Sequence, residues 1–426
     1  MNHSTPILSL FIVVLLSACT KDGFEKDYSV PVNKSITKVS LNEVQTGYMK
    51  AGNQFSLNLF DKVFNGNDLV FSPLSLQMAL AMSLNGASGE TADEIFNALG
   101  YRAQTENDIN EYCKLLMEQL PNVDKSVTLK ILNGIVADDD FTLKKDFTKK
   151  LKKYYYAPAE SYPFESPETI ERINDWAGRN TEWQVYPLLD KLSPNAVAVI
   201  LDAIYFKAKW GNTIFQYSEP ENLDFADENG KLTKREFMCT LVGIPYYSTE
   251  EFQLIEIPYE NGKFAMYVML PCVNKSGSCK ELIASLTEEA LCSAINSLKR
   301  TNVYVAFPKY ETESNLKLKE QLQKVGIVKA FDKVAADFSK MYENEGEWMN
   351  VWIDDVYQKT RFKVNEWGTE AASVTAVEYA GELEDDVDPT GKTSFIADHP
   401  FLYFVVEKGT GAIMFEGVFA GTNGND

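Results

Sequence analysis

The segment NAVAVILDAIYFKAKW at 195–210 constrains the fold more than any other part of the chain. It is an almost continuous run of Val, Ile, Ala and aromatic residues, with no Gly or Pro inside it. Such a run predicts a strand that is covered on both faces of a sheet. Asp202 lies inside the run, and a buried carboxylate must be paired or hydrogen-bonded. We therefore expect Asp202 to be a structural polar anchor and not a catalytic group.

Helices are predicted before this strand, and strands dominate after it. Apolar spacing, N-cap residues and terminating glycines predict helices over 55–64, 73–84 with Ser72 as N-cap, 88–99 ended by Gly100, 105–120, from Ser166 onward with Ile170, Ile173 and Trp176 facing inward, and 314–325 ended by Gly326. Further strands are predicted over 263–270, 303–310, 401–407 and 412–419, the last two joined by the hairpin signal KGTG at 408–411. This order predicts an α+β fold.

Composition and charge limit the partners. The 426 residues include 61 acidic and 41 basic ones, which gives a net charge of −20. No Lys/Arg block offers a phosphate-binding face, so we expect no nucleic-acid partner. We find no internal repeat or interdomain linker and expect one large domain over 46–426.

The N-terminus carries a targeting signal. An apolar run over 7–16 is too short for a lasting membrane helix, and Leu16-Ser17-Ala18-Cys19 follows it. This pattern resembles a bacterial lipobox, in which 1–18 is a signal peptide and Cys19 is lipidated. Residues 1–6 contain no Lys or Arg, which departs from the pattern, and a signal cleaved elsewhere is the alternative. Residues 19–45 are expected to form a polar tether.

Histidine and cysteine usage argue against a catalytic site. After removal of the signal the only histidine is His399, so a multi-histidine zinc site is excluded, and we interpret His399 as structural. No phosphate-loop or nucleophile-elbow motif appears in a usable context. We therefore expect no catalytic residue, no metal and no cofactor.

Besides Cys19, the chain has five cysteines, which we interpret as free thiols: Cys113, Cys239, Cys272, Cys279 and Cys292. A Cys272–Cys279 bridge is the alternative.

An ordered set of motifs resembles the serpin family, from about Tyr48 to Asn423. The set is FSPLS at 71–75, INDW at 173–176 with Thr181, DAIYFKAKW at 202–210, FPKYETESNLKLKEQLQKVGIVKAF at 307–331, ADFS at 336–339, VNEWGTEAA at 364–372 and ADHPFLYFV at 397–405. The resemblance implies helices packed around a large mixed main sheet, with smaller sheets and an exposed reactive-centre loop. Three positions depart from the family pattern. Asp202 replaces a usual Asn, Trp183 a usual Gly, and Trp367 a charged residue.

The resemblance implies that the reactive-centre loop spans about 366–392. Its hinge would be Glu366, Gly368, Thr369, Glu370, Ala371 and Ala372. Side chains of a strand alternate between its two faces. If the loop forms a strand, one face carries only uncharged residues, which we call the uncharged parity of the loop: Thr369, Ala371, Ser373, Thr375, Val377 and Tyr379. No proline occurs in the loop before Pro389 to block strand hydrogen bonds. The loop is thus suited to enter a sheet as a strand.

The position of the scissile bond follows from the family's spacing. Sixteen residues beyond the hinge Glu366 the chain reaches Glu382, so the predicted bond is Glu382–Leu383. The stretch from Glu382 to Pro400 is longer than usual for the family, so Tyr379, Leu383 and Val387 are alternative residues before the cut.

The resemblance implies that the protein is a suicide inhibitor of serine proteases, and by extension of cysteine proteases. The inhibitor itself would be no enzyme. It would act as a monomer on the bacterial cell envelope, at the outer membrane or cell surface, and contact the membrane only through Cys19. Two alternatives remain: a non-inhibitory serpin-fold binding or structural module on the envelope, and an envelope lipoprotein that binds glycan or nutrient.

Overall fold

The computed structural model describes residues 24, 30–33, 35–101, 105–193, 196–211, 214–216, 218–272, 278–343, 350–369 and 393–422. The helices in this part of the chain are α1 (Glu43–Val63), α2 (Pro73–Leu84), α3 (Gly89–Leu99), α4 (Glu106–Gln119), α5 (Lys145–Tyr155), α6 (Pro167–Asn180), α7 (Cys279–Ser285), α8 (Glu288–Asn296) and α9 (Lys319–Lys324), with short 3₁₀ turns η2 (Leu120–Asn122) and η5 (Lys329–Phe331). The strands are β1 (Leu69–Phe71), β2 (Thr128–Asp138), β3 (Ala159–Tyr162), β4 (Ala198–Lys209), β5 (Glu219–Ala226), β6 (Leu232–Ser248), β7 (Phe252–Pro258), β8 (Phe264–Pro271), β9 (Lys299–Pro308), β10 (Tyr310–Lys317), β11 (Ile353–Asn365), β12 (Gly368–Thr369), β13 (Thr393–Ile396), β14 (Phe401–Glu407) and β15 (Ala412–Phe419).

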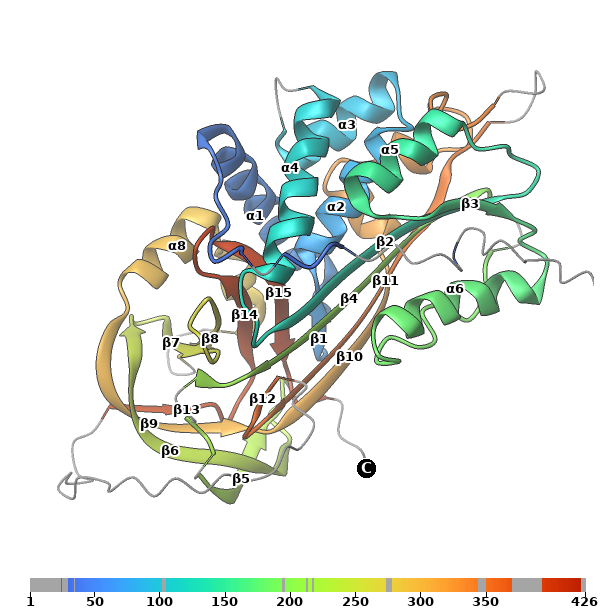
Figure 1. Cartoon of the computed structure of the whole chain (residues 1–426). Coiled ribbons are helices and arrows are strands. Elements are labelled where there is room, and N and C mark those ends of the chain that lie inside the picture. The colour runs from blue at the N-terminus through green and yellow to red at the C-terminus, as the bar shows by residue number, and fades with distance from the viewer. Residues whose placement is uncertain are drawn as a thin grey trace, which may run out of the picture.

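The strands form two sheets (Figure 1). The six-stranded sheet has the order β10-β11-β12-β4-β2-β3, and β11 also pairs directly with β4. The nine-stranded sheet has the order β1-β15-β14-β8-β7-β6-β9-β13, with β5 paired to β6. β9 and β10 are separated only by Lys309, so one run of chain passes from one sheet to the other. Helices packed on a large mixed sheet confirm the predicted fold class.

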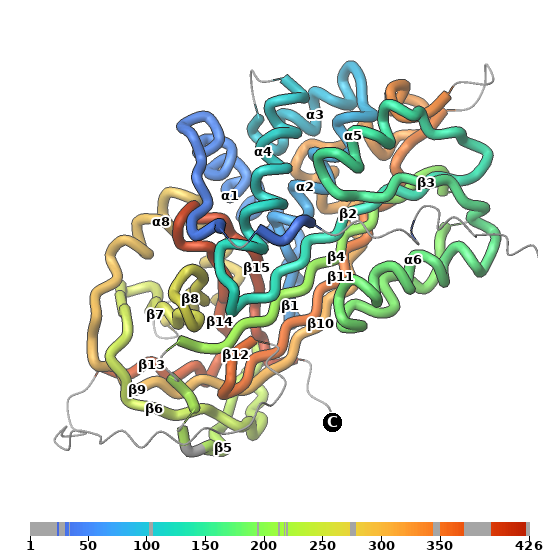
Figure 2. The backbone as a smooth tube through the Cα atoms, in the orientation of Figure 1, coloured from blue at the N-terminus to red at the C-terminus, as the bar shows by residue number. Residues whose placement is uncertain are grey.

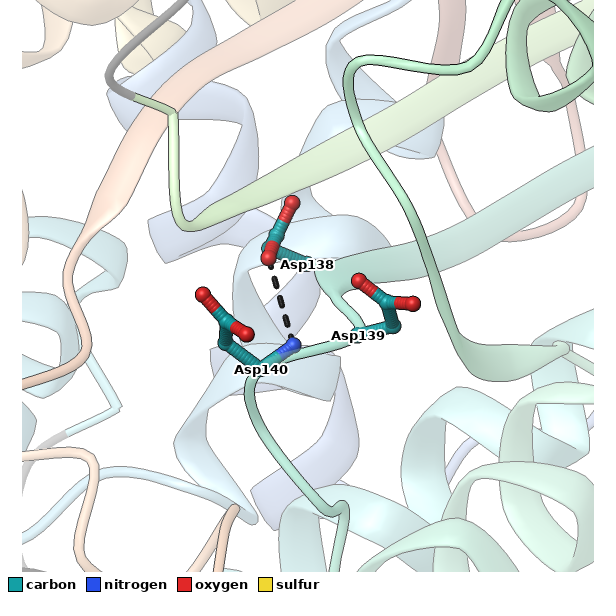
Figure 3. Close-up of side chains that lie close together, drawn as sticks. All are labelled: Asp138, Asp139 and Asp140. Carbon is teal, nitrogen blue, oxygen red and sulfur yellow. Dashed lines mark hydrogen bonds between the residues drawn. The ribbon is translucent and has the colours of Figure 1, made fainter.

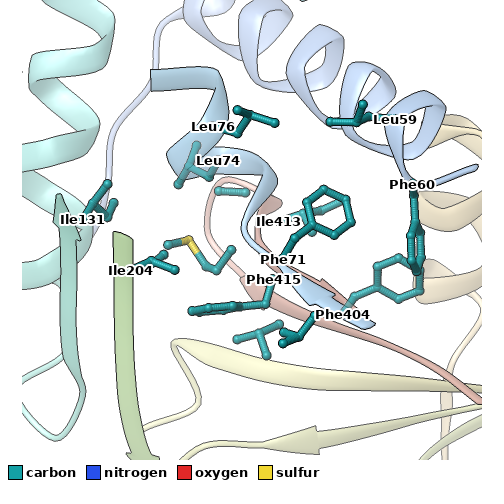
Figure 4. Packing of buried hydrophobic residues seen from close by; sticks show 14 of the residues in the cluster. Leu59, Phe60, Phe71, Leu74, Leu76, Ile131, Ile204, Phe404, Ile413 and Phe415 are labelled. Carbon is teal, nitrogen blue, oxygen red and sulfur yellow. The ribbon is translucent and has the colours of Figure 1, made fainter. Parts of the chain in front are cut away.

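The six-stranded sheet is covered on both faces, as the sequence of β4 predicts. On one face, Val199 and Leu201 pack in a cluster with Trp176 of α6. On the other, Ile204 faces the core beneath α2, together with Ile131 of β2 and Phe415 of β15 (Figure 4). α6 and α2 therefore lie on opposite sides of this sheet, which is also visible in the backbone trace (Figure 2).

The predicted boundaries of α2 and α3 are confirmed, whereas α1 begins at Glu43, twelve residues before its predicted start at Phe55. The Ser72 side chain accepts the amide of Ser75, and Pro73 occupies the first turn of α2. Gly100 ends α3 with a φ of 72°, in the left-handed region that favours glycine. The hairpin between β14 and β15 is also present.

The helix expected over 314–325 is wrong in its first half. Ser314 belongs to β10, which pairs with β11 along all its residues, and α9 begins only at Lys319. Buried Tyr310, Thr312 and Ser314 alternate with exposed Glu311 and Glu313, which is the period of a strand. The sequence analysis also did not predict the strands β1, β2, β3, β5, β6, β7, β11 and β13 or the helices α5, α7 and α8.

The segment expected to form a tether over 19–45 differs from that expectation where it is described. Phe24 is buried and its ring meets that of Trp176 edge-on at 5.0 Å. Val39 is also buried, and α1 starts at Glu43, inside the expected tether. The apolar side chains of Phe24 and Val39 explain why these residues pack against the domain instead of remaining extended in solvent.

No helix in the described ranges has the length and apolar character needed to cross a membrane. Cys19 and residues 1–18 lie outside those ranges.

Candidate functional site

The structure describes part of the predicted hinge. Glu366, Gly368 and Thr369 are described, whereas Glu370, Ala371, Ala372, Tyr379, Glu382, Leu383 and Val387 lie outside the described residues. The scissile bond and its alternatives therefore stay predictions.

The described hinge forms the short strand β12 between β11 and β4. A two-residue turn at Glu366 and Trp367 reverses the chain, so that Thr369 pairs with Val364 of β11. On its other side Thr369 pairs with Ala208 of β4. β12 is antiparallel to both neighbours, and it lies between the parts of β4 and β11 that do not pair directly with each other (Figures 1 and 2).

Gly368 is the residue that permits this approach. Its φ is 151°, and a Cβ at this position would lie 2.0 Å from the carbonyl oxygen of Ala208. Any other residue would collide with the backbone of β4. The close approach of β12 to β4 therefore depends on glycine.

Thr369 is held by a buried hydroxyl pair. The side chain is fully buried, and its Oγ1 lies 2.7 Å from the hydroxyl oxygen of Tyr259. Tyr259 is fixed by stacking on Trp210 at a ring distance of 4.9 Å, and burial raises the pKa of Tyr259 far above its ordinary value. The indole of Trp210 donates to the carbonyl of Asn365 at 2.7 Å. Neutral partners thus surround the Thr369 side chain.

Glu366 fixes the turn before β12. Its carboxylate lies 2.9 Å from Nζ of Lys309, which also contacts Glu236. Partial burial acts to raise the pKa of Glu366, but the hydrogen bond and charge of Lys309 outweigh it and hold that pKa below its ordinary value. The hinge is therefore tied to the start of β10 by an ion pair.

Beyond β12 the strands β4 and β11 converge. They pair directly and in parallel up to Ala203 and Lys359. From there they diverge, and β12 fills the divergence at Ala208 and Lys209. We call this arrangement the fork. β12 runs toward the end at which β4 and β11 pair directly, which we call the closed end of the fork. A strand that continued β12 would therefore have to separate β4 from β11.

A buried polar cluster holds the closed end of the fork. The fully buried Asp202 is the register partner of Gln358, and Gln358 Nε2 donates to Asp202 Oδ2 at 2.5 Å. The Ser75 hydroxyl donates to Asp202 Oδ1, and Asn133 Nδ2 lies 3.3 Å from the same oxygen. Gln358 also exchanges two hydrogen bonds of 2.9 Å with the backbone of Ser72. Asp202 is thus a hydrogen-bonded anchor, as its sequence position predicts.

Among the described residues, the partners of Asp202 are neutral donors, and none of them is a cation. Burial raises the pKa of Asp202 to about 7, although the hydrogen bonds from Ser75 and Gln358 act to lower it. The carboxylate and the neutral acid are therefore both accessible near neutral pH.

The other two departures from the family pattern have structural consequences. Trp183 has a φ of 64°, in the left-handed region, and its ring covers Gly178, where a Cβ would come within 2.5 Å of the ring. Trp367 is half-buried, and its carbonyl accepts the backbone amide of Trp210 at 3.1 Å. The backbone at position 367 therefore ties the hinge turn to the end of β4, whichever side chain stands there.

His399 and the cysteines have structural surroundings. The His399 Nδ1 lies 2.7 Å from Asp398 Oδ1, and its Nε2 lies 2.9 Å from the carbonyl oxygen of Pro271. Both ring nitrogens are thereby engaged next to β14.

All five predicted free cysteines are unpaired, namely Cys113, Cys239, Cys272, Cys279 and Cys292. The alternative Cys272–Cys279 bridge is therefore not formed.

Three consecutive acids lie at the turn after β2 (Figure 3). Asp138, Asp139 and Asp140 place carboxylate oxygens within 4.8 Å of one another, beside a cavity of about 980 Å³. Asp138 accepts the backbone amides of Asp140 at 3.2 Å and Phe164 at 3.0 Å. These bonds assign Asp138 to stabilising the turn.

Sequence reasoning missed several partners of the hinge and the fork. Tyr259, Lys309, Gln358 and Asn133 stand 50 or more positions from the residues that they contact. Lys309 lies in the quoted FPKY segment, but its spacing gives no sign of a contact with Glu366.

The comparisons agree on one family. The model described as "Serpin (serine protease inhibitor)" matches residues 50–421. Intracellular coagulation inhibitor 2 of Tachypleus tridentatus is 30% identical, over 86% of this chain and 89% of its own. The native structure of tengpin, a thermophilic serpin, superposes with a TM-score of 0.81 at 28% identity and covers 93% of this chain and 98% of its own. The structure of human thyroxine-binding globulin with its ligand gives a TM-score of 0.78 at 22% identity, with coverages of 88% and 98%.

Proposed function

The chain belongs to the serpin family, and we propose that it is a suicide inhibitor of serine, and by extension cysteine, proteases. The family consists in general of protease inhibitors and not of enzymes. The inhibitor itself needs no catalytic group, because the target protease performs the chemistry.

In the proposed mechanism the target cleaves the reactive-centre loop. Its nucleophile forms an ester or thioester with the carbonyl carbon of Glu382, and the amino group of Leu383 leaves as the new N-terminus. The loop then enters the fork as a strand, antiparallel to β4 and β11, and carries the acyl-enzyme with it. Strand addition supplies the driving free energy because it adds backbone hydrogen bonds on both sides.

The observation that supports this proposal is β12. Gly368 and Thr369 already lie between the two strands that insertion would separate, and they are directed toward the closed end of the fork. Thr369 is buried, as the uncharged parity of the loop requires for the first inserted side chain. The residues that would follow on that face are Ala371, Ser373, Thr375 and Val377, all uncharged.

A non-inhibitory binding module is the alternative. Its support is the likeness to thyroxine-binding globulin, whose structure contains a ligand, but at 22% identity this likeness concerns the fold alone. The small residues Ala371, Ala372 and Ser373 after β12 favour insertion instead, because they leave little bulk to desolvate.

For location, we propose a lipid anchor at Cys19 on the bacterial envelope, with the serpin domain as a monomer outside the membrane. The support is the LSAC sequence at 16–19 after an apolar run. Cys19→Ser should move the protein from the membrane fraction to the soluble fraction or leave it unprocessed. Unchanged membrane attachment would contradict the anchor.

Denaturing gel electrophoresis tests the inhibitory function. The protein is incubated with proteases that have basic, chymotrypsin-like and elastase-like specificity pockets. The expected result is a covalent complex with at least one of them and a released C-terminal peptide that starts at Leu383. Cleavage without a complex for every protease would refute the inhibitory proposal. A peptide that starts at Ala380, Glu384 or Asp388 would move the scissile bond to one of the alternatives.

A further inference from the structure

The closed end of the fork is held by a carboxylate that insertion must disturb. Asp202 and Gln358 are direct register partners on β4 and β11. A strand inserted between them would increase the spacing of β4 and β11 from about 4.8 Å to about 9.6 Å. The 2.5 Å hydrogen bond from Gln358 to Asp202 cannot survive that separation.

The other two partners of Asp202 remain in place after insertion. Asn133 is its register partner on β2, which lies on the side of β4 away from the fork. Ser75 lies on α2, which packs against β4. Insertion therefore removes one donor of three and leaves the carboxylate buried with the remaining two.

The neutral acid has a replacement partner that the carboxylate cannot use. Asn133 Oδ1 is buried and makes no hydrogen bond to any described residue. Rotation of the Asn133 amide would present this acceptor to a protonated Asp202. Because β2 and β4 stay paired, this bond would be available both before and after insertion.

No charged side chain faces Asp202 from the elements packed against it. α2 contains no titratable residue, and it presents Ser72 and Ser75. On β2, β4 and β11 the strand alternation places Lys130, Asp138, Tyr205, Lys207, Lys209, Tyr357, Lys359, Arg361 and Lys363 on the opposite face. Asp355 accepts backbone amides at the start of β11, and Asp354 lies beside it. Cys113 of α4, Tyr155 of α5 and Glu416 of β15 are buried on the same side of the sheet, but none of them shifts the titration of Asp202.

We propose that Asp202 is a proton-controlled latch on the fork, so that the sheet accepts a strand faster when Asp202 is protonated than when it is ionised. This inference rests on the proposed loop insertion. The ionised form loses its Gln358 donor on insertion, whereas the neutral form keeps partners in both states. At pH values above about 7, insertion is then coupled to the uptake of a proton by Asp202. Lowering the pH therefore promotes insertion.

The test measures strand acceptance as a function of pH. The probe is an acetylated, amidated and fluorescently labelled peptide with the sequence of residues 369–380, whose two glutamates stay ionised between pH 6 and pH 9. For the full-length chain we expect its rate of stable association to fall about tenfold or more from pH 6 to pH 9, since a hydrogen bond to a charged group is worth about that factor. Asp202→Asn should give a nearly constant rate, close to the acid rate of the native sequence.

Two further variants make the result specific. Glu416→Gln removes another fully buried acid that does not lie between β4 and β11, and it should keep the native pH dependence. Gln358→Met removes the donor from the closed fork, and it should raise the rate at pH 9 about tenfold and flatten the profile. Gln358→Met decides the question if Asp202→Asn does not fold.

The outcomes separate the latch from the inhibitory function. The latch alone would be overturned if the rate of peptide association with the native sequence did not change with pH. It would also be overturned if the rate changed equally with pH in Asp202→Asn. Absence of peptide association at every pH, together with absence of a covalent protease complex, would overturn both the latch and the proposed function.

Discussion

In the proposed mechanism, Thr369 is the first side chain of the loop to enter the sheet, so its chemistry would decide whether insertion can begin. It is fully buried against Tyr259 and the backbones of β4 and β11. Thr369→Arg would place a cation in this site, where the contacts described for Thr369 are neutral, and desolvating the cation there is costly. We expect the variant to be cleaved by the target at a similar rate but to form at least tenfold less covalent complex, measured by the ratio of complex to cleaved inhibitor on denaturing gels.

Glu370→Arg is the matched control, because the alternation of a strand would place residue 370 on the opposite face. It should keep most of the complex formation. Equal losses for the two variants would refute the assigned parity.

Glu416 is a second buried acid, and we expect it to affect folding stability and not the proposed insertion. Its Oε1 accepts the Ser56 hydroxyl at 2.6 Å, and its Oε2 is buried without a partner among the described residues. Burial raises the pKa of Glu416 from 4.5 to about 8, although the Ser56 hydrogen bond acts to lower it. Between these pH values the folded protein holds a proton that the unfolded chain has lost. Folding stability therefore decreases as the pH rises through this range and levels off above about 8.

Glu416→Gln removes this dependence. We expect it to stabilise the protein by roughly 2–4 kcal/mol at pH 9 and by much less at pH 4.5, from chemical unfolding midpoints at both pH values. Glu289→Gln on the exposed surface is the control. An equal effect of Glu416→Gln at both pH values would show that Glu416 does not titrate in this range.

The residues that hold the hinge could not be paired from the sequence. The hydroxyls of Thr369 and Tyr259 meet across 110 positions, and neither residue has a neighbour that signals the contact. Asp202 is different, because its place inside an apolar strand predicted a buried, hydrogen-bonded carboxylate. The identity of its donors depends on the register of β4 against β2 and β11, which a single strand does not specify.

At the scale of elements, β12 depends on its glycine. Gly368→Ala would put a methyl group 2.0 Å from the Ala208 carbonyl and force an unfavourable φ. We expect β12 to leave the fork, with a loss of roughly 2 kcal/mol or more in unfolding free energy. Faster hydrogen exchange at the Thr369 amide would report the release directly.

Gly66→Ala separates steric collision from backbone strain. Gly66 also has a positive φ, of 93°, but a Cβ there would meet nothing within 4 Å. This control should be destabilised without any change at Thr369. Unchanged exchange at Thr369 in Gly368→Ala would refute the role of glycine at the fork.

The helices α2 and α3 were predicted well from local signals, whereas the capped helices α7 and α8 were not predicted and α1 begins before its predicted start. The boundaries of α2 and α3 follow from Ser72, Pro73 and Gly100, which act within one turn of the chain. The error at Ser314 has a different origin. Apolar residues over 316–325 fit a helix, but pairing of β10 with β11, some 40 positions away, imposes a strand through Lys317.

At the scale of the whole molecule, the proposed mechanism requires the six-stranded sheet to accept a further strand at the fork. β4 and β11 are paired over part of their length, and two residues of β12 occupy the divergence between them. A complete inserted strand would form hydrogen bonds with both neighbours and bury a second set of side chains. The molecule that lacks this strand is therefore expected to be less stable than the molecule that has it.

Thermal unfolding before and after a single cut in the loop tests this expectation most directly. Calorimetry of the intact protein and of protein nicked within 379–388 should show a rise of at least about 10 °C in the unfolding midpoint, because a full strand adds many hydrogen bonds of about 1 kcal/mol each. Nicked Thr369→Arg should show a much smaller rise. An unchanged midpoint after clean nicking of the native sequence would contradict loop insertion.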